Sequence, residues 1–208
     1  MITIWGRANS VNVQKVLWVC DELVLPFERI EAGMQYGRNN EPEYLEMNPT
    51  GKIPTLVDGN FVLWESNSIL RYLTLEYGPT SLLYPGEPKV RASIERWLDW
   101  SLSTLQPAER PVFQCLVRTP AAERDEPKLV KDLAAVTALW KQLDTHLQGR
   151  FFLETDKFTL ADIVLGAYAK RWFGLEGVER PSLPNLERWY ARLATRTGFK
   201  KYVDLQLT

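Results

Sequence analysis

Cysteine and histidine are scarce in this chain, and their scarcity excludes several kinds of chemistry. The 208 residues include two cysteines, Cys20 and Cys115, and one histidine, His146. The cysteines are far apart in sequence and belong to no metal or redox motif, which indicates a reducing compartment. His146 has no cysteine or carboxylate at ligand spacing, so we expect no metal site. A Ser-His-Asp triad would have to use His146, and the motif G-x-S-x-G is absent.

Long apolar runs and an excess of one charge are also missing. No apolar run approaches the ~18 residues that span a bilayer, and residues 1–5 lack the basic start of a signal peptide. The formal net charge is −1, which gives no reason to expect a nucleic acid or an anionic membrane as a partner. We therefore expect a cytoplasmic protein that is neither exported nor inserted into a membrane.

Motifs for nucleotide cofactors are absent as well. Neither G-x-G-x-x-G nor G-x-x-x-x-G-K-[ST] occurs. An apolar share of 45% and a charged share of 25% describe an ordinary soluble globular protein. The chain thus offers no nucleophile of its own, and an enzyme of this kind would borrow one from a co-substrate.

The most informative stretch is Met47–Ser68, which reads MNPTGKIPTLVDGNFVLWESNS. Turn residues lead into Ile53-Pro54, and a proline disfavours helix in the residue before it, so Ile53 is expected to be extended. Whether this peptide bond is cis stays open, because only a minority of such bonds are. Asp58-Gly59, between two apolar runs, predicts a β-hairpin.

A helix is predicted directly after the hairpin. Its apolar face, which ends before Gly78, comprises Ile69, Leu70, Leu73 and Tyr77. Ser66 is predicted to be the N-cap. The free N–H groups of a helix start suit a carboxylate, and the neighbouring Glu65 is able to hold an ammonium group. The pair could therefore grip both ends of an amino-acid zwitterion, although an ordinary capped helix is the simpler alternative.

These motifs, N-P-x-G-K-I-P followed by a hairpin and E-S-x-x-I-x-x-Y-L, resemble the glutathione-binding half of the cytosolic glutathione S-transferases. The resemblance extends over almost the whole chain and is greatest to bacterial members with Ser or Thr, then Asn, near the N-terminus. It implies that glutathione is the co-substrate and that its thiol is the borrowed nucleophile. The expected reaction is attack on a small hydrophobic or halogenated electrophile, with conjugation, dehalogenation and reduction left open.

Strand and helix patterns also precede the informative stretch. Residues 2–5 and 27–31 are predicted strands, and a helix between them has the apolar stripe Val13, Val16, Leu17 and Cys20. Strand, helix and strand imply a parallel pair with a right-handed crossover. With a helical turn at residues 42–46 and the hairpin and helix that follow, the order is the thioredoxin-like one, which the resemblance also implies.

After residue 78 the periodicity is helical only. Residues 79–88 are rich in proline and glycine and are the predicted linker between a thioredoxin-like glutathione-binding domain, residues 1–78, and an all-helical domain, residues 89–208. We expect a long helix that is interrupted near Pro107 and Pro111, a second over residues 129–147, and a structural capping box at Thr159–Asp162. The fold class is α/β thioredoxin-like followed by all-α, and the resemblance implies that the helical domain contributes the electrophile pocket.

The loop before the first helix reads Asn9-Ser10-Val11-Asn12, where a thioredoxin-like redox protein carries C-x-x-C. Without cysteine there, disulfide exchange by the protein's own thiols is not expected. The resemblance places Ser10 where many classes carry their activating hydroxyl, and Asn12 where some bacterial members carry asparagine. Both are also preferred N-cap types, so a purely structural role is the alternative. We expect Ser10 to be the chief contact of the thiol.

The resemblance assigns the other site residues one by one. Lys52 would lie near the glycine carboxylate of glutathione, Ile53 before Pro54 would bind the cysteinyl backbone, and Glu65 with Ser66 would hold the γ-glutamyl end. Asp99 would reach that end from the other subunit of a homodimer. Candidates for the second-substrate pocket are Arg7, Trp100, Phe113, Arg118 and Trp172. Solvated arginine is the commoner explanation for Arg7 and Arg118.

A binding or assembly module with the same fold is the alternative to an enzyme. Such a module could lose its glutathione residues at no cost. Here Ser10, Lys52, Pro54, Glu65 and Ser66 occur together, which favours the enzyme. A small-molecule electrophile and a second copy of the chain are therefore the expected partners.

Overall fold

The computed structural model describes all 208 residues, which divide into two compact units. The first comprises Met1–Pro85 with Arg196–Leu205, and the second comprises Gly86–Thr195 with Gln206–Thr208. The division after Pro85 lies inside the linker expected at residues 79–88. Residues 196–205 differ from expectation, because they pack with the first unit although they follow the helical region. No helix has both the length and the apolar character needed to cross a membrane.

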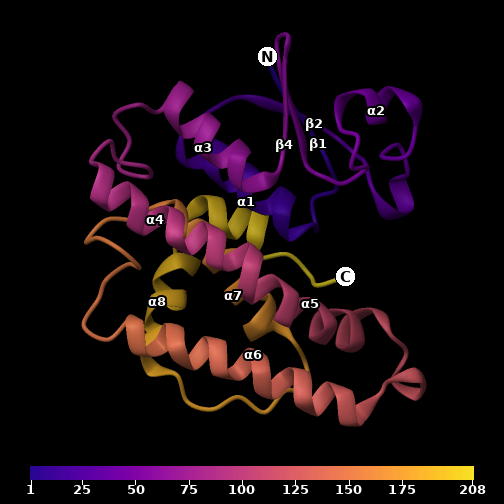
Figure 1. Cartoon of the computed structure of the whole chain (residues 1–208), viewed down its shortest axis with the longest axis vertical. Coiled ribbons are helices and arrows are strands. Elements are labelled where there is room, and N and C mark those ends of the chain that lie inside the picture. The colour runs from indigo at the N-terminus through magenta and orange to yellow at the C-terminus, as the bar shows by residue number, and fades with distance from the viewer. The chain divides into compact units, whose positions relative to one another are not determined.

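The first unit contains a mixed four-stranded sheet of order β2-β1-β3-β4. Its strands are β1 (Ile2–Trp5), β2 (Phe27–Ile30), β3 (Thr55–Asp58) and β4 (Phe61–Trp64). The β1–β2 pair is parallel and the β1–β3 and β3–β4 pairs are antiparallel. Figure 1 shows helices α1 (Val11–Glu22) and α3 (Ser66–Tyr77) on one side of the strands and α2 (Pro42–Met47) on the other. The thioredoxin-like order predicted from the sequence is therefore confirmed.

Helix α1 is the buried centre of this unit. Every residue from Val13 to Cys20 is buried, including Lys15, whose ammonium donates to the Asn67 side-chain oxygen on α3 at 3.0 Å. This bond ties α1 to the start of α3. A short 3-10 turn, η1 (Met34–Tyr36), lies between β2 and α2.

Side-chain contacts with α1 hold residues 196–205 in this unit. Phe199, in the π-helical turn η5 (Phe199–Val203), packs edge-on against Trp18 with ring centroids 5.3 Å apart. The Arg196 guanidinium donates two bonds, of 2.7 and 2.5 Å, to the Glu22 carboxylate. A Cβ at Gly198 would lie 2.4 Å from the Trp18 ring, so only glycine allows this approach. None of these contacts has a local sequence signature.

The second unit is all helical, and its first helices form a nearly continuous rod. The rod consists of α4 (Pro88–Trp100), η2 (Ser101–Leu105), α5 (Gln106–Phe113) and η3 (Gln114–Arg118). The interruption expected near Pro107 and Pro111 is wrong, because the joining residues keep right-handed helical backbone angles. Proline lacks a donor N–H, and the wider π turns before and after α5 accommodate the altered bonding.

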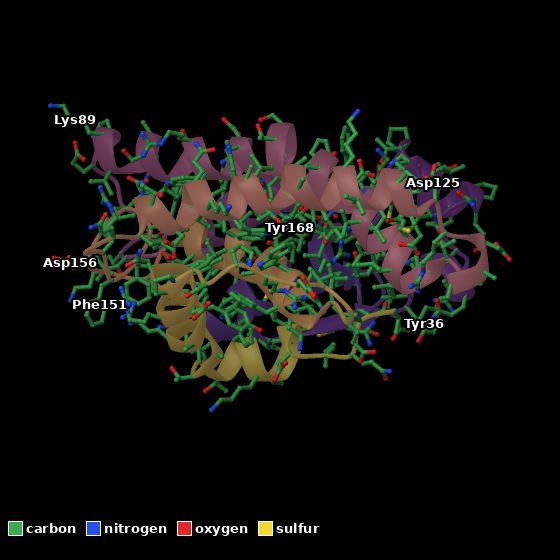
Figure 2. The ribbon with its side chains drawn as sticks, turned by 90° about the horizontal axis from the view of Figure 1, so that it is seen from below. Tyr36, Lys89, Asp125, Phe151, Asp156 and Tyr168 are labelled. Atoms are coloured by element: carbon green, nitrogen blue, oxygen red, sulfur yellow. The ribbon has the colours of Figure 1, made fainter.

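Helix α7 (Leu160–Gly174) is the buried helix of this unit. The other remaining elements are η4 (Ala121–Glu123), α6 (Glu126–His146) and α8 (Pro184–Ala194). Figure 2 shows Tyr168 of α7 among closely packed side chains, whereas Phe151 and Asp156, between α6 and α7, point outward. The capping box predicted at Thr159–Asp162 is present and starts α7 inside the core.

Candidate active site

The sheet register brings separate loops of the first unit to one edge. Trp5, the last residue of β1, pairs with Thr55, the first residue of β3, and Thr55 pairs with Trp64, the last residue of β4. The chain therefore leaves β1 toward Ser10, enters β3 from Ile53-Pro54, and leaves β4 toward Glu65 at the same level. Residues that are 55 positions apart in sequence become neighbours at one end of the sheet.

Ser10 occupies the N-cap position of α1 and is 7% exposed. Its side chain makes no capping hydrogen bond, while its backbone N–H donates to the Arg7 carbonyl at 3.2 Å. The simple N-cap interpretation therefore does not account for its hydroxyl. That hydroxyl remains able to donate to a ligand beside the helix start.

Asn12 lies inside the first turn of α1, so the N-cap is Ser10 and not Asn12. Its side-chain oxygen is buried and has no hydrogen-bond partner. The oxygen and nitrogen of an asparagine amide can exchange places by a flip of the side chain. Whichever of the two occupies this buried position, the protein gives it no hydrogen-bond partner. Unsatisfied buried polar groups are costly and rare, so this one leaves a hydrogen bond for a water molecule or a ligand to complete.

Lys52 projects from a loop that Asn48 holds in place. The Asn48 amide donates to the Lys52 carbonyl at 2.8 Å and to the Thr55 hydroxyl at 3.0 Å, while its oxygen accepts from Thr50. The Tyr44 hydroxyl donates to the same Lys52 carbonyl at 2.6 Å. The Lys52 side chain itself is exposed, so a backbone held by hydrogen bonds presents the lysine to solvent.

Asn48 and Tyr44 are positioning residues that sequence analysis missed. Both side chains are buried, with 1% of each exposed. Asn48 belongs to the turn motif before Lys52, and that motif was the only available signal. Tyr44 has none, because its partners Lys52 and Thr55 belong to a different element.

The Ile53-Pro54 bond is cis. Ile53 lies against Gly6, where an added Cβ would stand 3.4 Å from the Ile53 Cβ and 2.5 Å from Val13 Cγ2. Gly6 has a φ of 153°, and both the conformation and this close packing favour glycine. The β1–α1 loop therefore packs directly on the residue that is expected to bind a peptide backbone.

The prediction that Ser66 is the N-cap of α3 is wrong. Glu65 holds the N-cap position and Ser66 is the first helical residue, 3% exposed. Glu65 has a φ of 69° and a ψ of 108°, a conformation that costs a residue with a Cβ roughly 1–3 kcal/mol and is concentrated at functional sites. The first backbone bond within the helix runs from Ile69 to Glu65, so the helix start offers donors to an anion.

The proposed residues of the second unit have different surroundings. Asp99 is exposed and Trp100 is half-buried on α4, where the Trp100 ring packs edge-on against Trp97 with centroids 5.4 Å apart. Arg7 lies in the first unit, half-buried in the β1–α1 loop. These positions leave Trp100 and Arg7 accessible to a small molecule.

Arg118 is exposed, whereas Phe113, which is 3% exposed, and Trp172 are both buried core residues. The Arg118 guanidinium lies 5.1 Å from the centre of the Phe113 ring. Trp172 is 0% exposed and stacks on Trp140 with centroids 6.2 Å apart. An electrophile would have to displace core packing to reach Phe113 or Trp172, so burial argues against both as pocket residues.

Neither cysteine is placed to act as the nucleophile of this sheet edge. Cys20 is fully buried in α1, and burial, with the adjacent Asp21, raises the pKa of its thiol to about 12. Cys115 belongs to the second unit. The edge of the sheet therefore combines hydrogen-bond donors, a lysine and a carboxylate without a reactive thiolate.

Comparisons with known proteins agree with this arrangement. Residues 1–74 match the family model described as glutathione S-transferase, N-terminal domain, and residues 105–197 match that of the C-terminal domain. Glutathione S-transferase GstB of Escherichia coli K12 is 40% identical over 210 residues, with 100% of both chains covered.

Solved structures give the same result. A theta class glutathione S-transferase from Xanthomonas axonopodis pv. citri with glutathione bound is 43% identical, with a TM-score of 0.94 over 100% of this chain and 99% of that one. Bombyx mori glutathione transferase BmGSTD1 is 28% identical, with a TM-score of 0.88 over 98% of this chain and 93% of that one. The chain therefore belongs to the glutathione S-transferase family.

Proposed function

We propose that the chain is a glutathione transferase that binds glutathione along the sheet edge and activates its thiol for attack on an electrophile. The observation that carries this proposal is the convergence of the α1 start, the Ile53-Pro54 loop and the α3 start at one end of the sheet. The protein supplies donors and charges there but no nucleophile. A co-substrate with a thiol and both termini charged matches that combination.

Each end of glutathione has a matching group. Glu65 and the start of α3 at Ser66 bind the ammonium and carboxylate of the γ-glutamyl end, because a carboxylate pairs with the first and free helix N–H groups with the second. The backbone of Ile53 binds the cysteinyl part, next to Pro54, and Lys52 pairs with the glycine carboxylate. Asp99 of a second copy of the chain contacts the γ-glutamyl end.

Ser10 stabilises the thiolate, with Asn12 as the second donor. A free thiol has a pKa of about 8.5, and lowering it by ~2 units needs about 2.7 kcal/mol of preferential stabilisation. One charge-assisted hydrogen bond contributes ~1.5–3 kcal/mol and the start of α1 adds ~0.3–1 kcal/mol. These magnitudes suffice without a general base. The uncapped Ser10 hydroxyl and the unsatisfied Asn12 amide support this assignment.

The helical unit supplies the pocket for the electrophile. The half-buried Trp100 provides apolar contact, and the exposed Arg118 provides polar contact.

A homodimer follows from the same proposal. Phe61, Tyr72 and Tyr77 form an aromatic surface cluster on β4 and α3, with centroids 4.8 Å apart for Phe61–Tyr72 and 6.4 Å for Tyr72–Tyr77. Asp58 accepts hydrogen bonds from both tyrosine hydroxyls and thereby fixes the cluster. Phe61 is 46% exposed and Tyr77 40%, and a second copy would cover them.

Two free cysteines are compatible with a cytoplasmic location.

Glutathione consumption across electrophile classes tests the activity. Aryl halides, alkyl halides, epoxides, peroxides and mixed disulfides are incubated with glutathione and the protein, and calorimetry measures glutathione binding separately. We expect binding and enzyme-dependent thiol loss with at least one class. The variant Ser182→Ala, at an exposed loop serine of the helical unit, is the control substitution and should keep the glutathione binding and thiol consumption of the parent protein. Absence of glutathione binding by a folded protein would overturn the proposal.

A further inference from the structure

A side chain of strand β2 holds the loop between β1 and α1. Arg29 donates from Nη1 to the Gly6 carbonyl at 2.9 Å and from Nη2 to Glu31 Oε1 at 2.6 Å. Both side chains are half-buried, and Glu31 Oε2 is buried without a hydrogen-bond partner, so the Glu31 carboxylate is held through Oε1. The planar guanidinium thus bridges a carboxylate and a loop carbonyl with two of its nitrogens.

The peptide between Gly6 and Arg7 is fixed at both of its polar ends. Its carbonyl accepts from Arg29, and its N–H donates to the Ala32 carbonyl at 3.1 Å. Glycine leaves the backbone free to rotate, and these two bonds oppose a rotation of the peptide plane. The Ser10 N–H donates back to the Arg7 carbonyl at 3.2 Å, which closes residues 7–10 into a turn. A displacement of this peptide is therefore passed on to Ser10.

Packing defines the rest of the position of Gly6. The residue lies between Val13 of α1 and Ile53 of the Ile53-Pro54 loop, with no room for a Cβ. These contacts limit where the Cα of Gly6 lies, but they do not set the direction of its carbonyl. Because the hydrogen bond from Arg29 sets that direction, it also sets how the turn that carries Ser10 is oriented toward the Ile53 loop.

This orientation matters for the proposed chemistry. The cysteinyl part of glutathione is expected at Ile53 and the thiol donor at Ser10, so the two must be held at a defined distance. A hydrogen bond weakens steeply when the donor shifts or tilts, and functional groups need support from residues behind them to keep their geometry.

We propose that Arg29 is a positioning residue for thiol activation, which fixes the Gly6–Arg7 peptide and thereby directs the Ser10 hydroxyl toward the thiol. This inference rests on the proposed function and adds to it a residue that touches neither glutathione nor the electrophile. Arg29 acts through the loop and not through its charge, because the Glu31 carboxylate at 2.6 Å offsets that charge.

The test uses thiolate ultraviolet absorbance of the glutathione complex against pH, which gives the pKa of the bound thiol and needs no electrophile. Arg29→Met removes both hydrogen bonds and should raise this pKa by about half a unit or more. Arg29→Lys keeps the charge but loses the two-donor fork, so it should recover only part of the shift. Glu31→Gln retains an acceptor for Nη2 and should raise the pKa least.

Two further measurements separate positioning from binding. At about pH 5, where the bound thiol is protonated, calorimetry should give Arg29→Met a glutathione affinity within about threefold of the parent value. In the Ser10→Ala background, Arg29→Met should raise the thiol pKa little further, because the donor that it positions is gone. Arg150→Met, at an exposed arginine of the helical unit, is the control and should match the parent protein in both measurements.

Three results overturn the inference. A charge effect would leave Arg29→Lys like the parent protein and would lower the thiol pKa in Glu31→Gln. A lower melting temperature of Arg29→Met with an unchanged thiol pKa would show a purely structural bond. A full shift in the Ser10→Ala background would exclude an action through Ser10. If Arg29→Met does not fold, Arg29→Lys and Glu31→Gln decide, whereas absence of glutathione binding by the parent protein would refute the proposed function instead.

Discussion

Ser10 and Asn12 differ in how the protein uses their side chains, and that difference leads to a prediction. The side chain of Ser10 occupies the N-cap position without capping, and Asn12 lies inside the helix with a buried unsatisfied amide atom. We expect Ser10→Ala to raise the pKa of bound glutathione by about one unit or more and to lower turnover about tenfold or more. Thiolate ultraviolet absorbance of the glutathione complex against pH measures this pKa.

Asn12→Ala is the matched comparison. Because Asn12 makes no capping bond, its replacement should change the melting temperature little, and its effect on turnover should be smaller than that of Ser10→Ala. A raised thiol pKa in Asn12→Ala alone would reverse the two roles. No shift in either variant would identify backbone N–H groups as the donors.

Glu65 combines a strained backbone with a predicted role in binding. Glu65→Ala should weaken glutathione binding by ~2 kcal/mol or more, because the ammonium of the ligand loses its partner. Glu65→Gln keeps the size of the side chain and should lose most of the same affinity. Calorimetric titration with glutathione gives both values.

Glu76→Gln provides the control for Glu65, since this exposed carboxylate lies near the other end of α3. It should bind glutathione as the parent protein does. Wild-type affinity in a folded Glu65→Ala protein would refute the assignment of the γ-glutamyl end.

At the scale of elements, α7 depends on one buried carboxylate. Asp162 accepts hydrogen bonds from the Trp189 indole at 2.8 Å, from the Leu153 N–H at 3.0 Å, and from the backbone N–H and hydroxyl of Thr159 at 2.9 and 3.0 Å. It joins the start of α7 to α8 and to the preceding segment. Asp162→Ala should destabilise the protein by roughly 3 kcal/mol or more, because several buried donors lose their acceptor.

Asp162 also predicts a pH dependence of stability. Burial raises its pKa from 3.8 to about 6 despite the four hydrogen bonds. The folded state therefore binds a proton more tightly than the unfolded state, so this group lowers the free energy of unfolding as pH rises from about 4 to about 6, by on the order of 3 kcal/mol. Urea unfolding across this range measures the slope. Asp162→Asn should remove this contribution, and an identical slope in both proteins would contradict it.

At the scale of the whole molecule, the aromatic surface cluster predicts the assembly. Phe61→Asp places a charge in that cluster and should convert a dimer into a monomer. Light scattering over micromolar concentrations measures the mass. Val24→Asp, at a residue that is 87% exposed outside the cluster, should remain dimeric. A monomeric parent protein with full activity would rule out the homodimer.

Sequence patterns predicted most of the elements because the signals are local. Asp58-Gly59 with flanking apolar runs gave the hairpin, and the spacing of Val13 to Cys20 gave α1. Proline misled the prediction at Pro107 and Pro111, since π-helical turns let the backbone continue. Ser66 was misplaced by one residue because serine is a preferred cap, and that preference did not reveal the left-handed φ of Glu65.

By itself the sequence determined the order of the elements, the family resemblance and the residue types of the site, because propensity, turns and motifs act over a few neighbouring residues. Only the tertiary structure decided that Thr55 of β3 pairs with Trp5 of β1 on one side and with Trp64 of β4 on the other. This register brings the loops of the site to one edge of the sheet. The tertiary structure also decided that Trp172 is core and that Arg118 shares the Phe113 ring with Arg171. Such contacts join residues far apart in the chain, and the packing and electrostatics that select them have no local signature.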